Sequence, residues 1–432
     1  MDPRAASSAS GWARGLSWNV VALLFASASG LTATVLLAKN FGPAGLGVFS
    51  QTLTWFTLMA QAAALGVHYA VLHQTAIATT LEEAREAVDA GVTVVAVVAT
   101  IVAAISFLTA PAVSAVVESP PLVDTIRFAS VALIFHALAK VIAAGINGSR
   151  RMTAFSSVAA ARAAGMLVAV LMLGATRAPV GKLGLVFVAS EMAALFVAVI
   201  AWGRVRPILS LHYPRELARF GVKAAIAAVT VEANSRIDIA VLAIAASDNI
   251  VGIYTLAATA FEGTFQIFVV LRNQVNPSVA AAVGEDRPEK IDALFRQLRP
   301  WTWLVAGGIL ALATSAIVPL VHAFGLSTSF VEARGPLIIL LAGLLVAAPL
   351  LPFDQLLVVG GEPGAQSRVV VASVFVNLTL SVALVPWLGG IGAAIGTVGA
   401  ILTLVAGVSR GGRRILGTTF GLWPSLPIKP SS

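Results

Sequence analysis

Five polar or charged residues interrupt an apolar stretch at residues 220–246 that is long enough to cross a bilayer. They are Lys223, Glu232, Asn234, Arg236 and Asp238. On a helix, Glu232 and Arg236 lie one turn apart on one face, and the other three line the roughly opposite face. A charge near the bilayer centre costs at least about 2.5 kcal/mol, so such residues normally face a bundle interior or an aqueous cavity. We therefore expect this helix to line a substrate or ion path.

Basic residues also lie inside other apolar runs, and together they predict a basic cavity. The candidate substrate-binding residues are Lys140, Arg162, Lys223, Arg236 and Arg272, with Asn19 and Asn234 as neutral polar candidates. Arginine offers a planar fork that suits phosphate oxygens, so this set favours an anionic substrate. The alternative is that Glu232 neutralises Arg236 locally. Under that alternative, Lys223 and Arg272 extend their charged ends to the membrane interface.

Acidic residues inside the apolar runs are candidates for ion coupling. They are Glu191, Glu232, Asp238, Glu262 and Asp354. A buried carboxylate can carry a proton, or it can bind Na⁺ together with freed backbone carbonyls. Pro349 and Pro352 precede Asp354, and we expect a broken span there. Charge compensation within the helix bundle is the competing interpretation, and the sequence favours neither.

The composition defines a membrane protein. Hydrophobic residues make up 58% of the 432 positions and charged residues only 11%, against about 25% charged in soluble domains. The absence of cysteine excludes disulfides, thiolate metal sites and cysteine nucleophiles. Basic residues are scattered between apolar runs without interleaved aromatics, so no nucleic acid is expected as a partner. No P-loop, HExxH motif or nucleophile elbow occurs, and we expect no enzyme and no cofactor.

Hydropathy predicts an all-α, polytopic protein of about twelve transmembrane helices. The apolar runs cover residues 15–38, 47–71, 90–116, 128–147, 154–175, 184–203, 220–246, 250–275, 300–323, 336–359, 368–388 and 390–409. One set of alternate loops, with both termini, holds eighteen Lys and Arg residues, and the other set holds five. This bias predicts that both termini are cytoplasmic. The expected divisions are a leader at 1–14, an N-lobe at 15–203, a cytoplasmic loop at 204–219, a C-lobe at 220–409 and a basic tail at 410–432.

An internal repeat supports two lobes of six helices. The stretch LLAKNFGPAGLGVFSQTL at residues 36–53 aligns without gaps with VLAIAASDNIVGIYTLAA at residues 241–258. A weaker match relates residues 181–190 to 389–398. Equivalent spans start on the same side of the membrane because six is even. The two lobes are therefore expected to be related by a pseudo-two-fold axis along the membrane normal, with substrate bound between them.

Local signals predict several details of the cytoplasmic and buried regions. Thr80 with Glu83, and Asp286 with Glu289, have capping-box spacing before helices. The apolar stripe at Ile291, Leu294, Phe295 and Leu298 favours a helix that lies along the membrane surface, with a solvated linker helix as the alternative. Asn377 is expected to form an interhelical hydrogen bond. Gly392 and Gly396 are expected to let helices pack closely.

The chain resembles a known family of exporters. The motifs are Arg236-Ile237-Asp238 with Gly252-Ile253-Tyr254, Phe41-Gly42-Pro43 with Gly47-Val48-Phe49, and Asn377 followed by LVPWLGGIGAAIGT. They are similar to the polysaccharide-transport branch, with its Wzx-type oligosaccharide flippases, of the multidrug/oligosaccharidyl-lipid/polysaccharide (MOP) exporter superfamily. This resemblance covers nearly the whole chain and implies the MOP exporter fold.

The resemblance also implies a function in the inner (plasma) membrane. Members of this branch move polyprenyl-pyrophosphate-linked oligosaccharides from the cytoplasmic to the outer leaflet, by alternating access, for cell-surface polysaccharide synthesis. The implied partners are a lipid-linked anionic glycan, the bilayer, and a polysaccharide polymerase or other envelope-assembly proteins. Coupling to H⁺ or Na⁺ stays open. The alternatives are a cation-coupled multidrug antiporter of the same fold, which would favour an acidic and aromatic cavity, or a lipid II-type flippase.

Overall fold

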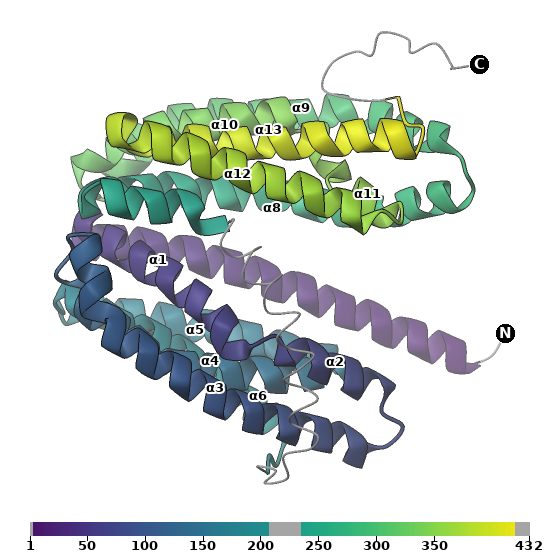
Figure 1. Cartoon of the computed structure of the whole chain (residues 1–432), viewed down its shortest axis with the longest axis horizontal. Helices are drawn as coiled ribbons and strands as arrows, with labels where there is room; N and C mark the ends of the chain where they lie inside the picture. The colour runs from purple at the N-terminus through teal and green to yellow at the C-terminus, as the bar shows by residue number, and fades with distance from the viewer. Residues whose placement is uncertain (1–2, 207–234, 420–432) are drawn as a thin grey trace. The chain divides into compact units, whose positions relative to one another are not determined.

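Every regular element in the described chain is a helix, as expected from the sequence. The computed structural model describes residues 3–206 and 235–419, with side chains described from residue 25 onward. The chain divides into two compact units, Met1–Arg236 and Ile237–Ser432. Figure 1 shows long, roughly parallel helices in each unit. We describe the two units separately. The lobe boundaries expected from the sequence remain a prediction.

Unit 1 is built around α4. Its described elements are α1 (Pro3–Ala64), α2 (Val67–Ile77), α3 (Leu81–Val116), α4 (Leu122–Gly148), α5 (Met152–Ala175), η1 (Val180–Gly184) and α6 (Leu185–Trp202). Helix α4 packs against α1, α2, α3 and α6, and it is the most buried of the described candidate spans. Polar residues of α4 such as Thr125 and Ser130 are therefore buried inside unit 1.

Unit 2 is built from longer helices and shorter broken pieces. After a described helical segment at residues 235–245 come α8 (Asp248–Gly284), α9 (Pro288–Ala323), η2 (Thr328–Ala333), α10 (Arg334–Ala347), η3 (Leu351–Phe353), α11 (Leu356–Val359), α12 (Pro363–Leu388) and α13 (Gly390–Ile415). Helix α10 packs against α8, α9 and α13, and α12 pairs with α13.

The helices identify a multi-pass membrane protein. Nine described helices are long and apolar enough to cross a bilayer, and the bent pair formed by Phe25–Ala64 and α2 makes ten. Large apolar side chains on them are exposed, such as Leu108 (75%), Phe196 (68%) and Phe375 (70%). Such surfaces suit lipid rather than water. The predicted run at 15–38 lies in α1, and the run at 47–71 covers the end of α1 and the start of α2. Most of 220–246 lies outside the described residues, so twelve spans remain a prediction.

A break in α1 matches the sequence repeat. Gly42 has φ 67° and ψ −172°, a region that is essentially restricted to glycine. Pro43 follows it and has no backbone N–H to donate. In unit 2 the aligned residue is Ser247, which separates the helical residues 235–245 from α8. The repeat therefore aligns two chain breaks at equivalent positions, which chance similarity between apolar segments does not explain.

Two more spans are interrupted, and the sequence predicted one of these breaks. Helix α1 ends before Leu65 and Gly66, which both have positive φ (45° and 64°), and α2 continues at a bend of 50°. The apolar run at 47–71 carried no sign of this bend. The break expected near Pro349 and Pro352 is confirmed, because α10 ends at Ala347 and the chain continues as η3 and α11.

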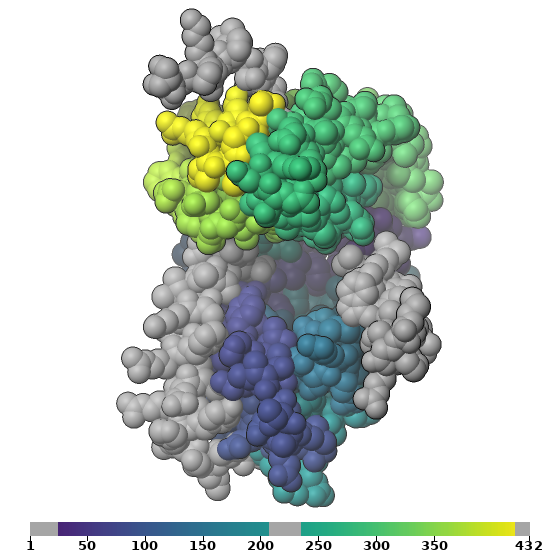
Figure 2. Space-filling model, turned by 90° about the vertical axis from the view of Figure 1, so that its right-hand side faces the viewer, coloured from purple at the N-terminus to yellow at the C-terminus, as the bar shows by residue number. Residues whose placement is uncertain are grey.

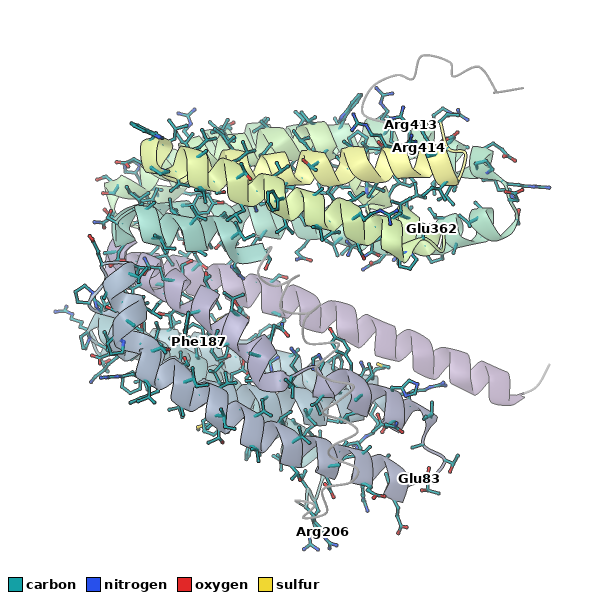
Figure 3. All side chains as sticks on the ribbon, in the orientation of Figure 1. Glu83, Phe187, Arg206, Glu362, Arg413 and Arg414 are labelled. Atoms are coloured by element: carbon teal, nitrogen blue, oxygen red, sulfur yellow. The ribbon has the colours of Figure 1, made fainter. Side chains whose placement is uncertain are left out.

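The first predicted capping box is confirmed. The backbone N–H of Glu83 donates to Oγ1 of Thr80 at 3.2 Å, and the backbone N–H of Thr80 donates to Oε2 of Glu83 at 3.4 Å. These bonds satisfy two of the amide groups that a helix start leaves unpaired. Figure 3 shows Glu83 at the exposed end of α3.

The second predicted capping box is wrong. Asp286 has a positive φ of 54°, and α9 begins at Pro288 with Arg287 as the N-cap residue and no side-chain cap. Proline suits the first helical position because its missing N–H would be unpaired there anyway. The helix start is therefore set by Pro288, and Asp286 belongs to the turn before it.

The helix predicted to lie on the membrane surface is also wrong. Residues 288–299 form the first turns of α9, which continues to Ala323. Their apolar stripe is buried within unit 2: Ile291 is 1% exposed and Phe295 is 6% exposed. The Phe295 ring lies 5.9 Å from that of Phe353 in η3. An amphipathic stripe indicates an apolar neighbour, and here the neighbour is protein rather than lipid.

Close packing of α12 and α13 through small residues is confirmed. A Cβ added to Gly392 would lie 2.6 Å from the carbonyl carbon of Leu384, and one added to Gly396 would lie 2.2 Å from Oγ of Ser381. In the space-filling view, the yellow residues of α13 lie against the yellow-green residues of α12 (Figure 2). The interhelical hydrogen bond predicted for Asn377 is not found among the described residues. Its Oδ1 accepts instead from Oγ of Ser381 within α12.

Candidate functional site

The close approach of α5 and α6 brings the first group of intramembrane charges together. Gly165 lies one turn from Arg162, and a Cβ added to it would lie 2.8 Å from the carbonyl oxygen of Ala189. Ser190 donates through Oγ to the carbonyl oxygen of Arg162 at 3.0 Å. A small residue on α5 thus lets the two backbones meet, and the next residue of α6, Glu191, lies beside Arg162.

Arg162 and Glu191 form a partly buried ion pair. Nε of Arg162 donates to both carboxylate oxygens of Glu191, at 2.9 and 3.1 Å. The side chain of Glu191 is 5% exposed and that of Arg162 is 35% exposed. Removing one partner of a buried pair typically costs about 3–5 kcal/mol, because the other charge is left uncompensated. Losing either partner alone would therefore destabilise the fold, and the pair neutralises part of the charge expected of the cavity.

His136 on α4 adds a third member to this pair. Its Nδ1 lies 3.1 Å from Oε1 of Glu191, a contact whose geometry is not that of a hydrogen bond. The ring meets Phe56 edge to face at 5.6 Å. Glu191 therefore lies between an arginine of α5 and a histidine of α4, in a setting from which water is largely excluded.

One turn further along α4, Lys140 extends the cluster. Its Nζ donates to Oε1 of Gln61 on α1 at 2.9 Å. Two aromatic residues, Phe56 and Phe187, pack on the same side with ring centroids 4.9 Å apart. Figure 3 shows Phe187 among the helices of unit 1. Among the described residues of this cluster, the lysine and the arginine outnumber the one carboxylate by one charge.

The second ion pair lies in unit 2 and involves the broken span. Nη1 of Arg272 donates to Oδ2 of Asp354 at 3.0 Å, and the two side chains are 18% and 10% exposed. One turn along α8, Asn276 donates to Oε1 of Gln355 at 3.1 Å. Gln366 of α12 donates to the backbone carbonyl oxygen of Asp354 at 2.9 Å. The interpretation that Arg272 extends to the membrane interface is therefore wrong, since it is held inside unit 2.

Asp238 takes part in a different kind of contact. It is 8% exposed, and its Oδ2 accepts from the hydroxyl of Tyr254 at 2.5 Å and from that of Thr397 at 3.2 Å. No ion pair joins Asp238 to a basic side chain of the described chain. Within the described residues, this carboxylate is therefore held by hydroxyl groups.

The remaining candidates are placed only in part. Arg236 is half-buried at the start of the described helical residues 235–245, and Glu262 is exposed on α8. Lys223, Glu232 and Asn234 lie outside the described residues. The side chain of Asn19, on α1, also lies outside what the structure describes. The grouping of polar residues expected at 220–246 is therefore untested.

Several residues of these clusters were missed by the sequence argument. His136 lies four residues before Lys140, so both share one face of the run at 128–147. That spacing was the available signal for His136. No sequence pattern indicated the four amide side chains of these clusters, because burying a neutral amide costs little free energy and the sequence does not show which partner it will meet. They are Gln61, Asn276, Gln355 and Gln366. Among the described residues, no group of three or more His, Asp or Glu could hold a metal ion.

The fold defines the class of protein. A multidrug resistance MATE family transporter of the MOP superfamily, in an inward-facing conformation, superposes with a TM-score of 0.72 at 14% identity, covering 92% of this chain and 98% of its own. The lipid II flippase MurJ gives a TM-score of 0.76 at 13% identity, covering 91% and 87%. A eukaryotic MATE transporter gives 0.62 at 11% identity, covering 92% and 94%. The chain therefore has the MOP exporter fold.

The family model is more specific than the fold. The model described as "Polysaccharide biosynthesis protein" matches residues 36–325, about two-thirds of the chain. The protein belongs to this polysaccharide biosynthesis family. A comparison with curated protein sequences finds no match. The resemblance read from the sequence motifs is thus confirmed at the level of family and superfamily.

Proposed function

We propose that this protein is a flippase for lipid-linked oligosaccharides. It would move a polyprenyl-pyrophosphate-linked glycan from the cytoplasmic to the outer leaflet for cell-surface polysaccharide synthesis, by alternating access of two six-helix lobes. The observation that carries this proposal is membership of the polysaccharide biosynthesis family, on a chain with the fold of MOP transporters.

The charge of unit 1 supports an anionic substrate. In the described part of this cluster, the two cations Lys140 and Arg162 outnumber the one acid, Glu191. A pyrophosphate needs charge-assisted donors, and in a site with little water these bonds are worth more than at an exposed surface. The proposed binding residues remain Arg236, Arg162, Lys140, Lys223, Arg272, Asn234 and Asn19, and among them Arg272 is committed to an ion pair.

Ion coupling would use an acid that no arginine neutralises. Asp238 is held by hydroxyl groups, which can accompany either a proton on the carboxyl group or a small cation beside it. Asp354 is paired with Arg272, and its role in the proposal is structural. We place the protein in the inner membrane with both termini cytoplasmic, beside a polysaccharide polymerase or other envelope-assembly proteins. Reporter fusions at residue 432 test this orientation.

Depletion of the protein followed by mass spectrometry of lipid extracts tests the function. Accumulation of a polyprenyl-pyrophosphate glycan on the cytoplasmic leaflet supports the flippase. The MATE transporters and MurJ, which share the fold, suggest two alternative functions. Unchanged lipids together with sensitivity to cationic dyes would indicate a multidrug antiporter, and accumulation of lipid II would indicate a peptidoglycan precursor as the substrate.

Arg236 offers a test at one residue. If the substrate phosphate is its main partner, Arg236→Ala should leave normal membrane levels and abolish transport, and Arg236→Ala with Glu232→Ala should not restore it. If Glu232 is the main partner, the single change leaves a carboxylate unpaired and lowers the amount of folded protein. Immunoblots of membranes, read beside the lipid analysis, separate the two outcomes. Recovery of transport in the double variant would show that Arg236 is structural.

A further inference from the structure

The two intramembrane ion pairs of the described chain use their arginines differently. Arg272 donates to Asp354 through a terminal nitrogen, Nη1. Arg162 donates to Glu191 through Nε alone, in two bonds. Among the described residues, nothing accepts a hydrogen bond from the terminal nitrogens of Arg162, and its side chain is twice as exposed as that of Arg272, 35% against 18%. The outer edge of the Arg162 guanidinium is therefore open while its inner edge is held.

The groups that hold the inner edge are fixed by packing. Glu191 is 5% exposed and lies where α6 meets α5, beside the bond from Ser190 to the Arg162 carbonyl oxygen. His136 approaches Glu191 from α4, the most buried described span of unit 1. Because the guanidinium is planar and Nε is held by Glu191, the guanidinium has little freedom to rotate. The directions of its two terminal NH₂ groups are therefore fixed before a ligand binds.

We infer that Glu191 and His136 are positioning residues that hold Arg162 by Nε, so that its two terminal nitrogens face a phosphate-type anion. The terminal nitrogens of arginine match two oxygens of one phosphate group, and prior orientation reduces the entropy lost on binding. This inference rests on the proposed function and assigns Glu191 a task other than carrying a coupling ion. It also assigns a task to His136, which no sequence pattern had singled out.

Removing Glu191 should change anion binding in opposite directions, depending on whether Glu191 positions Arg162 or acts only through its charge. Among the described residues, the charged or polar groups near this site include Gln61 of α1, His68 of α2, His136 and Lys140 of α4, Arg162 of α5 and Glu191 of α6. Glu191 is the acid in this group, so through charge alone it repels an anion and its removal should tighten anion binding. If Glu191 acts by orienting Arg162, its removal should weaken anion binding instead.

Binding of geranylgeranyl pyrophosphate to the purified full-length protein tests the inference, with geranylgeraniol as the reference that lacks the anion. Glu191→Gln should weaken pyrophosphate binding by at least about tenfold, the loss expected when one charge-assisted hydrogen bond goes. Arg162→Lys should weaken it similarly, because lysine keeps the charge and loses the fork. His136→Ala should weaken it as well, because the contact of the ring with Glu191 is lost. His136→Asn, which keeps a polar group near the Nδ1 position, should bind more tightly than His136→Ala.

A double variant and a charge-matched control complete the test. In an Arg162→Ala background, Glu191→Gln should have no further effect, because Glu191 acts only through Arg162. Asp89→Asn also removes one negative charge from unit 1. In the described chain the Asp89 side chain accepts from the backbone N–H of Arg206, away from Arg162, and this variant should bind pyrophosphate like the wild type. Unliganded thermal unfolding confirms that each variant is folded.

The outcomes distinguish this inference from the proposed function. Unchanged or tighter pyrophosphate binding by Glu191→Gln, with the wild type binding normally, would overturn the positioning role and leave the flippase proposal standing. Equal binding of geranylgeranyl pyrophosphate and geranylgeraniol by the wild type would overturn both. Further weakening by Glu191→Gln when Arg162 is already absent would show that Glu191 acts on the fold or the ligand directly, and would also overturn the inference.

Discussion

The break at Gly42 allows a prediction whose size follows from backbone geometry alone. Gly42 has φ 67° and ψ −172°, and nothing lies within 4 Å of a Cβ added there. Gly42→Ala therefore meets no steric crowding, and its cost is that of holding an L-residue in a conformation reserved for glycine. Such strain costs about 1–3 kcal/mol. We expect the free energy of unfolding to fall by that amount.

Gly30 in the same helix is the matched control. A Cβ added to Gly30 also meets nothing within 4 Å, and its φ is not in the positive range. Gly30→Ala should therefore be neutral, or should stabilise the helix by about 0.5–1 kcal/mol, because alanine is the better helix former. Thermal unfolding of the two purified variants beside the wild type measures both effects. Equal shifts in the same direction would refute the assignment of the break to the backbone of Gly42.

Two further predictions concern packing inside unit 2. Asp354→Ala leaves Arg272 without its carboxylate and should destabilise the protein by about 3–5 kcal/mol; Arg272→Leu added to it should recover much of the loss in a thermal unfolding assay, and a failure to recover would indicate that Asp354 acts through other partners. Gly396→Val places new atoms against Ser381, 2.2 Å from the added Cβ, and should cost about 1–3 kcal/mol or more. A normal melting temperature for Gly396→Val would contradict the close contact of α12 and α13.

Patterns with local causes could be predicted from the sequence. The capping box at Thr80 depends on residues within one turn of each other, and the break near Pro349 depends on proline chemistry at that position. The spans depend on apolar runs longer than a soluble helix needs. The same reasoning failed at Asp286, because Pro288 two residues later starts the helix by itself. The capping-box spacing and the preference of proline for the first helical position predicted different helix starts there, and the sequence did not show which of the two would decide.

Pairings between distant residues could not be predicted. Arg162 and Glu191 are 29 positions apart, and Arg272 and Asp354 are 82 apart. Which acid meets which base is decided by how helices pack, and small residues such as Gly165 control that packing. The stripe at Phe295 shows a related limit, because hydropathy does not distinguish a lipid neighbour from a protein one. The sequence thus predicted which residues lie in the membrane and not which of them are already paired.

The basic ends of the helices bear on the orientation that we propose. Arg413 and Arg414 lie in the last turn of α13, where positive charge is favoured by the helix dipole as well as by the cytoplasmic leaflet. Figure 3 shows these two residues and Glu362, before α12, towards the same end of unit 2. The cytoplasmic C-terminus remains a proposal that rests on the loop bias in the sequence.

Transbilayer movement of a lipid-linked sugar by the purified protein tests the central proposal most directly. Proteoliposomes would carry a short polyprenyl-pyrophosphate-linked sugar in both leaflets, and a membrane-impermeant glycosidase added outside would report how much substrate becomes accessible. We predict that accessibility rises from about half to nearly all of the substrate with the wild-type protein, and stays near half with Arg162→Ala and with empty liposomes, because unassisted crossing would take the charged headgroup through the bilayer core. Equal accessibility with wild-type protein and with empty liposomes would contradict the account.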